Sequence, residues 1–138
     1  MAKNFSKKDM IKLQNLLRKS KKTITTAESC TGGLVASMIT KISGSSDIFN
    51  GSIVTYSNSI KNKELDVLNE SLDKFGAVSK QVVSEMLDGV LRKFEADFAI
   101  AISGVAGPNG GTKNKPVGTI VRGIASNKNI NLKETFNE

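Results

Sequence analysis

The chain has 138 residues, the size of one folded domain, and is long enough to build a hydrophobic core. Hydrophobic residues make up 38% and charged residues 24%, which indicates a globular protein rather than a disordered one. There is no histidine and one cysteine. These absences exclude Ser-His and Cys-His catalytic pairs, His-ligated zinc and a disulfide within the chain.

The formal net charge of +7 comes from the first 22 residues, which hold eight basic side chains and one carboxylate. The other 116 residues carry equal numbers of acidic and basic groups. A nucleic-acid surface needs a basic patch together with a base-reading motif, and no zinc-finger, RRM or KH signature is present. We therefore expect a solvated basic helix face and disfavour nucleic acid as a partner, although a basic N-terminal helix keeps that alternative open.

No apolar run approaches the roughly 20 residues of a membrane helix. The opening sequence MAKNFSKKDM lacks the apolar segment of a signal peptide. We expect a single cytoplasmic domain over residues 1–138, without a membrane partner.

The first half of the chain alternates predicted helices and strands. Residues 6–19 form a predicted helix, in which Ser6 and Asp9 resemble a capping box. A β-branched run predicts a strand over 23–27, and a second helix opens after it and ends at Gly44. A second strand is predicted over 53–56 and a short helix over about 59–68.

The second half begins with a predicted loop over 69–78, followed by a helix that Ser79 caps. Residues 98–102 are apolar throughout, as in a central strand covered on both faces. A glycine-rich loop over 103–115 then leads to strands over 117–125 and 130–135, joined by a turn. This order predicts an α/β protein, a three-layer α/β/α sandwich with a mixed sheet.

Ligands in α/β sheets bind where strands end and helices begin. Three predicted strand exits are rich in hydroxyls or glycines: ESCTGG at 28–33, YSNSIK at 56–61 and SGVAGPNGG at 103–111. If the strands are parallel, all three exits lie on one rim of the sheet. We expect a site there.

Ser29 is a candidate nucleophile and Lys61 a candidate base, because a Ser-Lys pair activates a serine without histidine. Burial would lower the pKa of the lysine and free its amine to accept a proton. Each residue also has a structural alternative: Ser29 as a helix cap and Lys61 as a surface lysine. The candidate substrate-binding residues are Glu28, Thr31, Gly32, Gly33, Tyr56, Ser103, Gly104, Gly107 and Gly110.

Glu28 and Cys30 flank Ser29, and the sequence allows structural roles for both. Glu28 could orient a ligand, cap a helix or form an ion pair, and Cys30 is expected to be a buried structural thiol. No cluster with metal-ligand spacing is present, so we expect neither a metal nor a cofactor.

The motifs TAESCTGG, YSNSIK and SGVAGPNGGT, followed by KPVGT, resemble the CinA-like C-terminal domain family, whose stand-alone members are nicotinamide-nucleotide amidohydrolases. The resemblance implies a mostly parallel, five-stranded mixed sheet and a homodimer. It also implies deamidation of nicotinamide mononucleotide to nicotinic acid mononucleotide and ammonia, with Ser29 as nucleophile and Lys61 as base. Tyr56 would shape the site, and Ser103 stands where relatives usually have threonine.

Relatives of this kind continue past the final strand into an arginine-bearing segment and a closing helix, which this sequence does not include. We therefore expect one face of the sheet to be uncovered. A non-catalytic nucleotide-binding or regulatory domain is the alternative to the amidohydrolase.

Overall fold

A computed structural model describes residues 4–136 of the chain. The helices are α1 (Lys7–Ser20), α2 (Leu34–Thr40), α3 (Asn58–Leu65), α4 (Asn69–Phe75) and α5 (Lys80–Phe94), with a short 3₁₀ turn, η1 (Ser45–Asp47). The strands are β1 (Ile24–Glu28), β2 (Ile53–Val54), β3 (Phe98–Gly104), β4 (Thr119–Ser126) and β5 (Ile130–Phe136).

The five strands form one mixed sheet in the order β2-β1-β3-β4-β5. β1 pairs in parallel with β2 and β3, whereas β4 pairs antiparallel with both β3 and β5. The carboxyl ends of β1, β2 and β3 therefore lie at the same edge of the sheet, as the sequence predicted. The expected α/β/α sandwich with a mixed sheet is confirmed.

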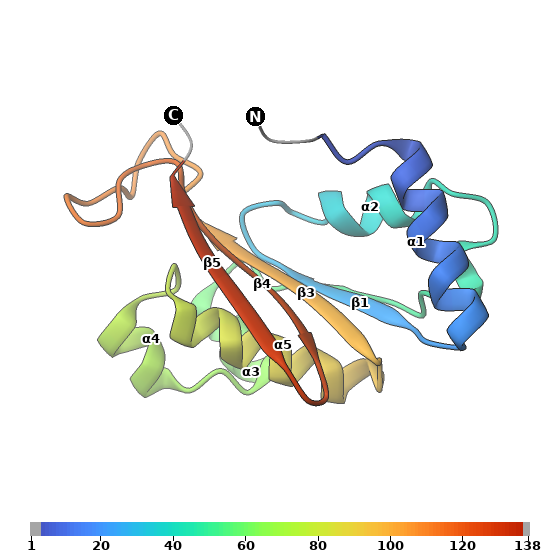
Figure 1. Ribbon diagram of the computed structural model, residues 1–138. Coiled ribbons are helices and arrows are strands. Elements are labelled where there is room, and N and C mark those ends of the chain that lie inside the picture. The colour runs from blue at the N-terminus through green and yellow to red at the C-terminus, as the bar shows by residue number, and fades with distance from the viewer. Residues whose placement is uncertain (1–3, 137–138) are drawn as a thin grey trace.

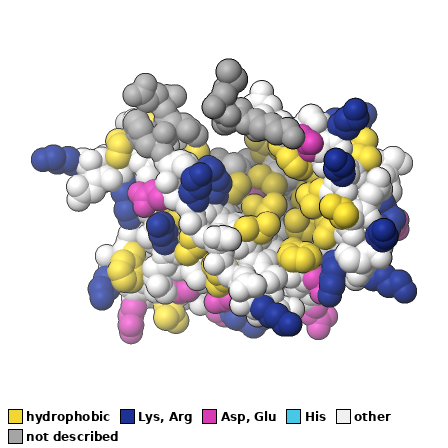
Figure 2. Space-filling view, in the orientation of Figure 1, with side chains coloured by type: hydrophobic (Ala, Val, Ile, Leu, Met, Phe, Trp, Pro, Cys, Tyr) yellow, Lys and Arg dark blue, Asp and Glu magenta, His cyan; other side chains and the backbone are white. Residues whose placement is uncertain are grey.

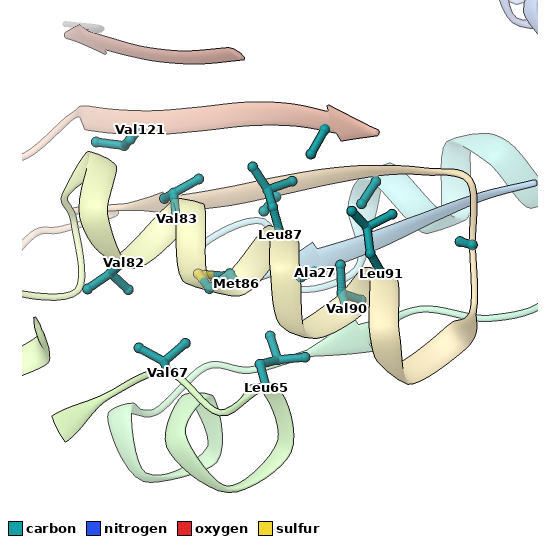
Figure 3. Packing of buried hydrophobic residues seen from close by; sticks show 14 of the residues in the cluster. Ala27, Leu65, Val67, Val82, Val83, Met86, Leu87, Val90, Leu91 and Val121 are labelled. Atoms are coloured by element: carbon teal, nitrogen blue, oxygen red, sulfur yellow. The ribbon is translucent and has the colours of Figure 1, made fainter. Parts of the chain in front are cut away.

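The helices lie on both faces of the sheet, with α1 and α2 on one side and α3, α4 and α5 on the other (Figure 1). The larger core lies beneath α5, whose inward side chains pack between the sheet and α3 (Figure 3). In that view Val83 and Leu87 lie toward Val121 of the sheet, while Leu65 and Val67 lie on the opposite side of α5. This packing fixes α3, and thus Lys61, relative to the sheet.

The helix that begins near Ser6 is confirmed, together with its capping box: Asp9 N donates to Ser6 Oγ (3.1 Å) and Ser6 N donates to Asp9 Oδ2 (2.9 Å). The predicted loop over 69–78 was wrong, because residues 69–75 form α4. Of its large apolar side chains, Leu72 is buried (7% exposed) whereas Phe75 is 41% exposed. A single buried apolar side chain leaves little hydrophobic periodicity for a sequence pattern to detect.

The helices on the α1 side leave part of the sheet exposed over β4 and β5. Figure 2 shows hydrophobic side chains gathered on this face between α1 and the β4–β5 hairpin. A cavity of about 440 Å³ on this face is lined mainly by apolar residues, among them Ile100, Ile102 and Ile124. Ile124 of β4 is 50% exposed, so this part of the sheet face is open to solvent within the described residues.

Candidate active site

The strand exits predicted from the sequence line a cavity of about 320 Å³ at the edge of the sheet. The segments that reach it follow β1, β2 and β3, and the loop between α4 and α5 adds a further wall. The lining residues are Ser29, Cys30, Tyr56, Asn58, Lys61, Ala77, Val78, Ser103, Gly104, Val105, Ala106, Gly107, Asn109 and Gly110.

Ser29 lies in the tight turn between β1 and α2. Its backbone N donates to Ile102 O of β3 (3.0 Å), and its carbonyl accepts from Gly32 N (3.0 Å). Gly32 and Gly33 both have positive φ (62° and 104°), a conformation that side chains disfavour and that lets the chain reverse here. The Ser29 side chain is therefore fixed at the cavity, with the residue only 7% exposed.

Lys61 reaches the cavity from α3, a helix that Ser57 caps through Ile60 N (3.2 Å). The residue is 1% exposed, and its Nζ donates to Ser29 Oγ at 3.1 Å. Nζ also donates to the carbonyls of Thr55 (2.9 Å) and Tyr56 (3.4 Å). A buried lysine tip without a carboxylate among these contacts is costly to keep charged.

Burial lowers the pKa of the Lys61 amine below its usual value of 10.5, because desolvation disfavours the ammonium form. The charge of a deprotonated Cys30 thiol acts in the opposite direction and is the smaller effect. The interpretation of Lys61 as an ordinary surface lysine is therefore wrong.

The Glu28 side chain is buried (0% exposed) and points its oxygens at the start of α2. Oε1 accepts from Val35 N (2.9 Å) and Oε2 from Ala36 N (3.0 Å), while the hydroxyls of Thr31 and Thr26 donate at 2.7 and 3.0 Å. Among the three alternatives left open by the sequence, the structure gives Glu28 the role of helix cap. Burial alone would raise the pKa of this carboxyl, but the four hydrogen bonds outweigh it and lower the pKa below 4.5.

Cys30 was expected to be a buried structural thiol, but it is partly exposed and lines the cavity next to Ser29. Burial raises the pKa of the thiol above its usual 9.0, despite hydrogen bonds to the sulfur from the amides of Cys30 and Thr31. A Cβ at Gly104 would lie 2.9 Å from the Cys30 sulfur and 3.0 Å from Thr119 O. Glycine at this position therefore leaves room for the thiol.

The structure brings together most of the candidate residues, but not all. Seven of them line the cavity: Ser29, Lys61, Tyr56, Ser103, Gly104, Gly107 and Gly110. The others, Glu28, Thr31, Gly32 and Gly33, are not lining residues and instead build the turn and the start of α2. Tyr56 is 68% exposed and lies at the mouth, while Ser103 is 1% exposed.

The sequence analysis missed the contribution of Ala77 and Val78, which line the wall between α4 and α5. These two small apolar residues follow a helix rather than a strand. The expectation that ligands bind where strands end therefore does not point to them. Asn58 was also missed, although it follows the Ser57 cap inside the YSNSIK motif. The position of Asn58 in that motif was the available signal.

Within residues 4–136, no group of three or more histidine, cysteine, aspartate or glutamate side chains is placed to hold a metal ion. None of the helices in this part of the chain has the length and apolar character needed to span a bilayer.

The sequence profile described as CinA C-terminal domain matches residues 7–138. A CinA-like protein of Prochlorococcus marinus (strain MIT 9312) is 57% identical over 123 residues, which is 88% of this chain and 29% of that protein. A CinA-like protein of Pseudothermotoga lettingae is 46% identical over 121 residues, or 88% of this chain and 30% of that protein. The chain thus spans less than a third of the length of these relatives.

Solved structures agree with these matches. The competence/damage inducible protein CihA from Agrobacterium tumefaciens is 36% identical with a TM-score of 0.91, and the match covers 97% of this chain and 82% of that one. The competence damage-inducible protein A from Klebsiella pneumoniae is 32% identical with a TM-score of 0.91, covering 96% of this chain and 82% of that one. With its fold and motifs matched in this way, the chain belongs to the CinA C-terminal domain family.

Proposed function

We propose that this domain is a metal-independent amidohydrolase that deamidates nicotinamide mononucleotide through an acyl-enzyme on Ser29. The observation that carries the proposal is the 3.1 Å contact between Lys61 Nζ and Ser29 Oγ, two buried groups at an open cavity. Helix capping alone would not require a desolvated amine beside the serine hydroxyl. The substrate itself comes from the family resemblance of the three motifs.

The lowered pKa of Lys61 supports its role as the base. When the amine is neutral, the same contact allows the Ser29 hydroxyl to donate its hydrogen to Nζ. Lys61 takes that proton as Oγ forms a bond to the carboxamide carbon, and returns it to the nitrogen as the C–N bond breaks and ammonia leaves. Water, with Lys61 again as base, then cleaves the ester to the carboxylate and restores Ser29.

The oxyanion formed during attack needs hydrogen-bond donors at the cavity. Gly32 N already donates to the Ser29 carbonyl oxygen. Ala106 and Gly107 line the cavity, and their amides donate no hydrogen bond within residues 4–136. We infer that these two amides stabilise the oxyanion.

The cavity also has the size and chemistry for a pyridine nucleotide. Its volume of about 320 Å³ lies at the lower end of small-molecule sites. Tyr56 gives the mouth an exposed aromatic ring, against which a flat cationic ring can stack. Because the chain spans less than a third of its curated relatives, the proposal concerns the chemistry of this domain alone.

The test is release of ammonia from nicotinamide mononucleotide in metal-free buffer by wild type and by Ser29→Ala. We expect the variant to lose roughly 10³-fold or more of kcat while its far-UV CD is unchanged. Ser37→Ala, at an exposed serine of α2, is the matched control and should keep wild-type turnover.

Hydroxylamine makes the test more specific, because an acyl-enzyme would transfer its acyl group to it and give the nucleotide hydroxamate. Full activity in Ser29→Ala would contradict the assignment. Nucleotide binding by wild type without any ammonia release would support a non-catalytic, nucleotide-binding domain instead.

A further inference from the structure

The loop that joins β3 to β4, residues 105–118, forms one wall of the cavity and projects from the end of the sheet (Figure 1). Two hydrogen bonds close its base: Val105 N donates to Thr119 O (2.9 Å) and Gly118 N donates to Val105 O (2.7 Å). The chain therefore leaves and re-enters the sheet through a narrow neck, the natural place for a hinge.

Beyond this neck, the two limbs of the loop pack closely, with Gly107 and Gly111 of one limb against Val117 of the other. A Cβ at Gly107 would lie 2.4 Å from Val117 Cγ1, and one at Gly111 would lie 2.7 Å from Val117 N. The tip is closed by Thr112 N donating to Lys115 O (2.9 Å) and Lys115 N donating to Thr112 Oγ1 (3.0 Å). This close packing holds the two limbs of the loop together.

One side chain ties this loop to the opposite wall. Lys115 Nζ donates to Phe75 O at the end of α4 (2.5 Å). The last carbonyls of a helix lack partners within it and carry the negative end of its dipole, so a lysine ammonium suits this place. Ala77 and Val78, which follow within three residues, line the cavity. The hydrogen bond thus links two walls of the same cavity.

We propose that residues 105–118 are a hinged flap over the Ser29–Lys61 cavity and that Lys115 is the latch holding it to the C-terminus of α4. Lys115 acts as a positioning residue: it touches neither reacting group and sets how the loop with Ala106 and Gly107 faces Ser29. Release of the latch admits the ligand, and its closure restores the wall. The catalytic part of this role rests on the proposed amidohydrolase function, whereas the opening of the flap does not.

Cys30 is the only cysteine of the chain and lines the cavity, so its alkylation by iodoacetamide measures access without requiring catalysis. We expect Lys115→Met to accelerate alkylation roughly threefold to tenfold at pH 8.5, the range for losing one such hydrogen bond. Lys113→Met, at an exposed lysine of the same loop, is the control and should react at the wild-type rate. Lys115→Arg should restore most of the protection, because its guanidinium also donates to a carbonyl.

Thermal melts by CD would show whether Lys115→Met is globally destabilised. In either case, hydrogen exchange of the hydrogen-bonded amides at the end of α4 (Gly76) and at the base of the loop (Val105 and Gly118) reports local opening. Faster exchange confined to these two segments supports the latch. Wild-type rates of alkylation and exchange in Lys115→Met, or equal acceleration in Lys113→Met, would overturn it.

Turnover provides the second readout. If the domain deamidates nicotinamide mononucleotide, Lys115→Met should raise KM several-fold with a smaller change in kcat, since the Ser29–Lys61 contact is untouched. If wild type releases no ammonia, the proposed function fails while the alkylation result still decides the latch.

Discussion

The buried Lys61 amine leads to a prediction about pH. Its pKa lies below 10.5 because of desolvation, and only the neutral amine can accept the Ser29 proton. We therefore expect kcat/KM to rise with pH and to level off below the pH at which an ordinary lysine titrates. Lys61→Met should lose about 10²–10⁴-fold of kcat and this pH dependence with it. A pH–rate profile without an inflection below 10.5 would argue against Lys61 as the base.

The effect of the same group on stability has a definite sign. Lys61 binds its proton less tightly in the folded protein than in the unfolded chain, so the unfolded state holds more protons between the two pKa values. Protonation of Lys61 thus opposes folding at lower pH, and this cost disappears as pH rises toward 10.5. Lys61→Met lacks this cost and should fold at least as stably as wild type at neutral pH.

Glu28 gives a prediction with the opposite pH dependence. Its carboxylate accepts four hydrogen bonds, and an amide in its place keeps only one acceptor oxygen. We expect Glu28→Gln to lower the free energy of unfolding by about 2 kcal/mol at pH 7, measured by urea denaturation. The folded pKa of Glu28 is depressed, so its stabilising contribution is present above pH 4.5 and is lost as pH falls through the folded value.

The gap between the urea curves of wild type and Glu28→Gln should therefore narrow below pH 4.5. Equal stability of the two proteins at pH 7 would contradict the capping role. Glu70→Gln, at an exposed carboxylate of α4, is a suitable control and should change stability little.

At the scale of the elements, the crossing of α3 and α5 determines where Lys61 lies. A Cβ at Gly89 of α5 would lie 2.1 Å from Leu65 O, the last residue of α3, so the helices touch through backbone. We expect Gly89→Ala to force α3 outward, with a loss of about 1–3 kcal/mol of stability and a fall in kcat as Lys61 shifts. Asp88→Ala, at the exposed neighbouring position, controls for the change to alanine.

Thermal melts and ammonia release from the same preparations would measure both effects of Gly89→Ala. If stability falls while kcat is unchanged, the position of α3 does not depend on this contact.

The elements also show where sequence patterns stop being informative. The predicted helix after Ser29 ran to Gly44, whereas α2 ends at Thr40. The apolar positions continue beyond Thr40, and Ile48 is fully buried, but the backbone has already left the helix for η1. The spacing of apolar residues indicates which side chains face the core. It cannot distinguish a helix from a turn whose side chains pack into the same core.

For the molecule as a whole, the fold class and the meeting of the strand exits could be predicted because they depend on general rules, whereas the roles of Ser29 and Lys61 were expected from the family resemblance. Helices alternating with strands imply parallel pairing, and parallel strands bring their exits to one edge. The role of Glu28 could not be predicted, since three uses of a carboxylate fit the same sequence. Neither could the contact of Lys115 with Phe75, which joins residues 40 apart with no shared pattern.

The sheet has a parallel part, β2-β1-β3, and an antiparallel part, β3-β4-β5, and this division affects how the domain can diversify. The segments that follow the parallel strands β1 and β2 carry the serine and the lysine, while the proposed flap joins the antiparallel pair β3–β4. Changes at the exposed tip, around residues 112–114, lie beyond the neck and leave the reacting pair in place. Substitutions or insertions in this loop can therefore change which ligands enter the cavity while the positions of Ser29 and Lys61 stay the same.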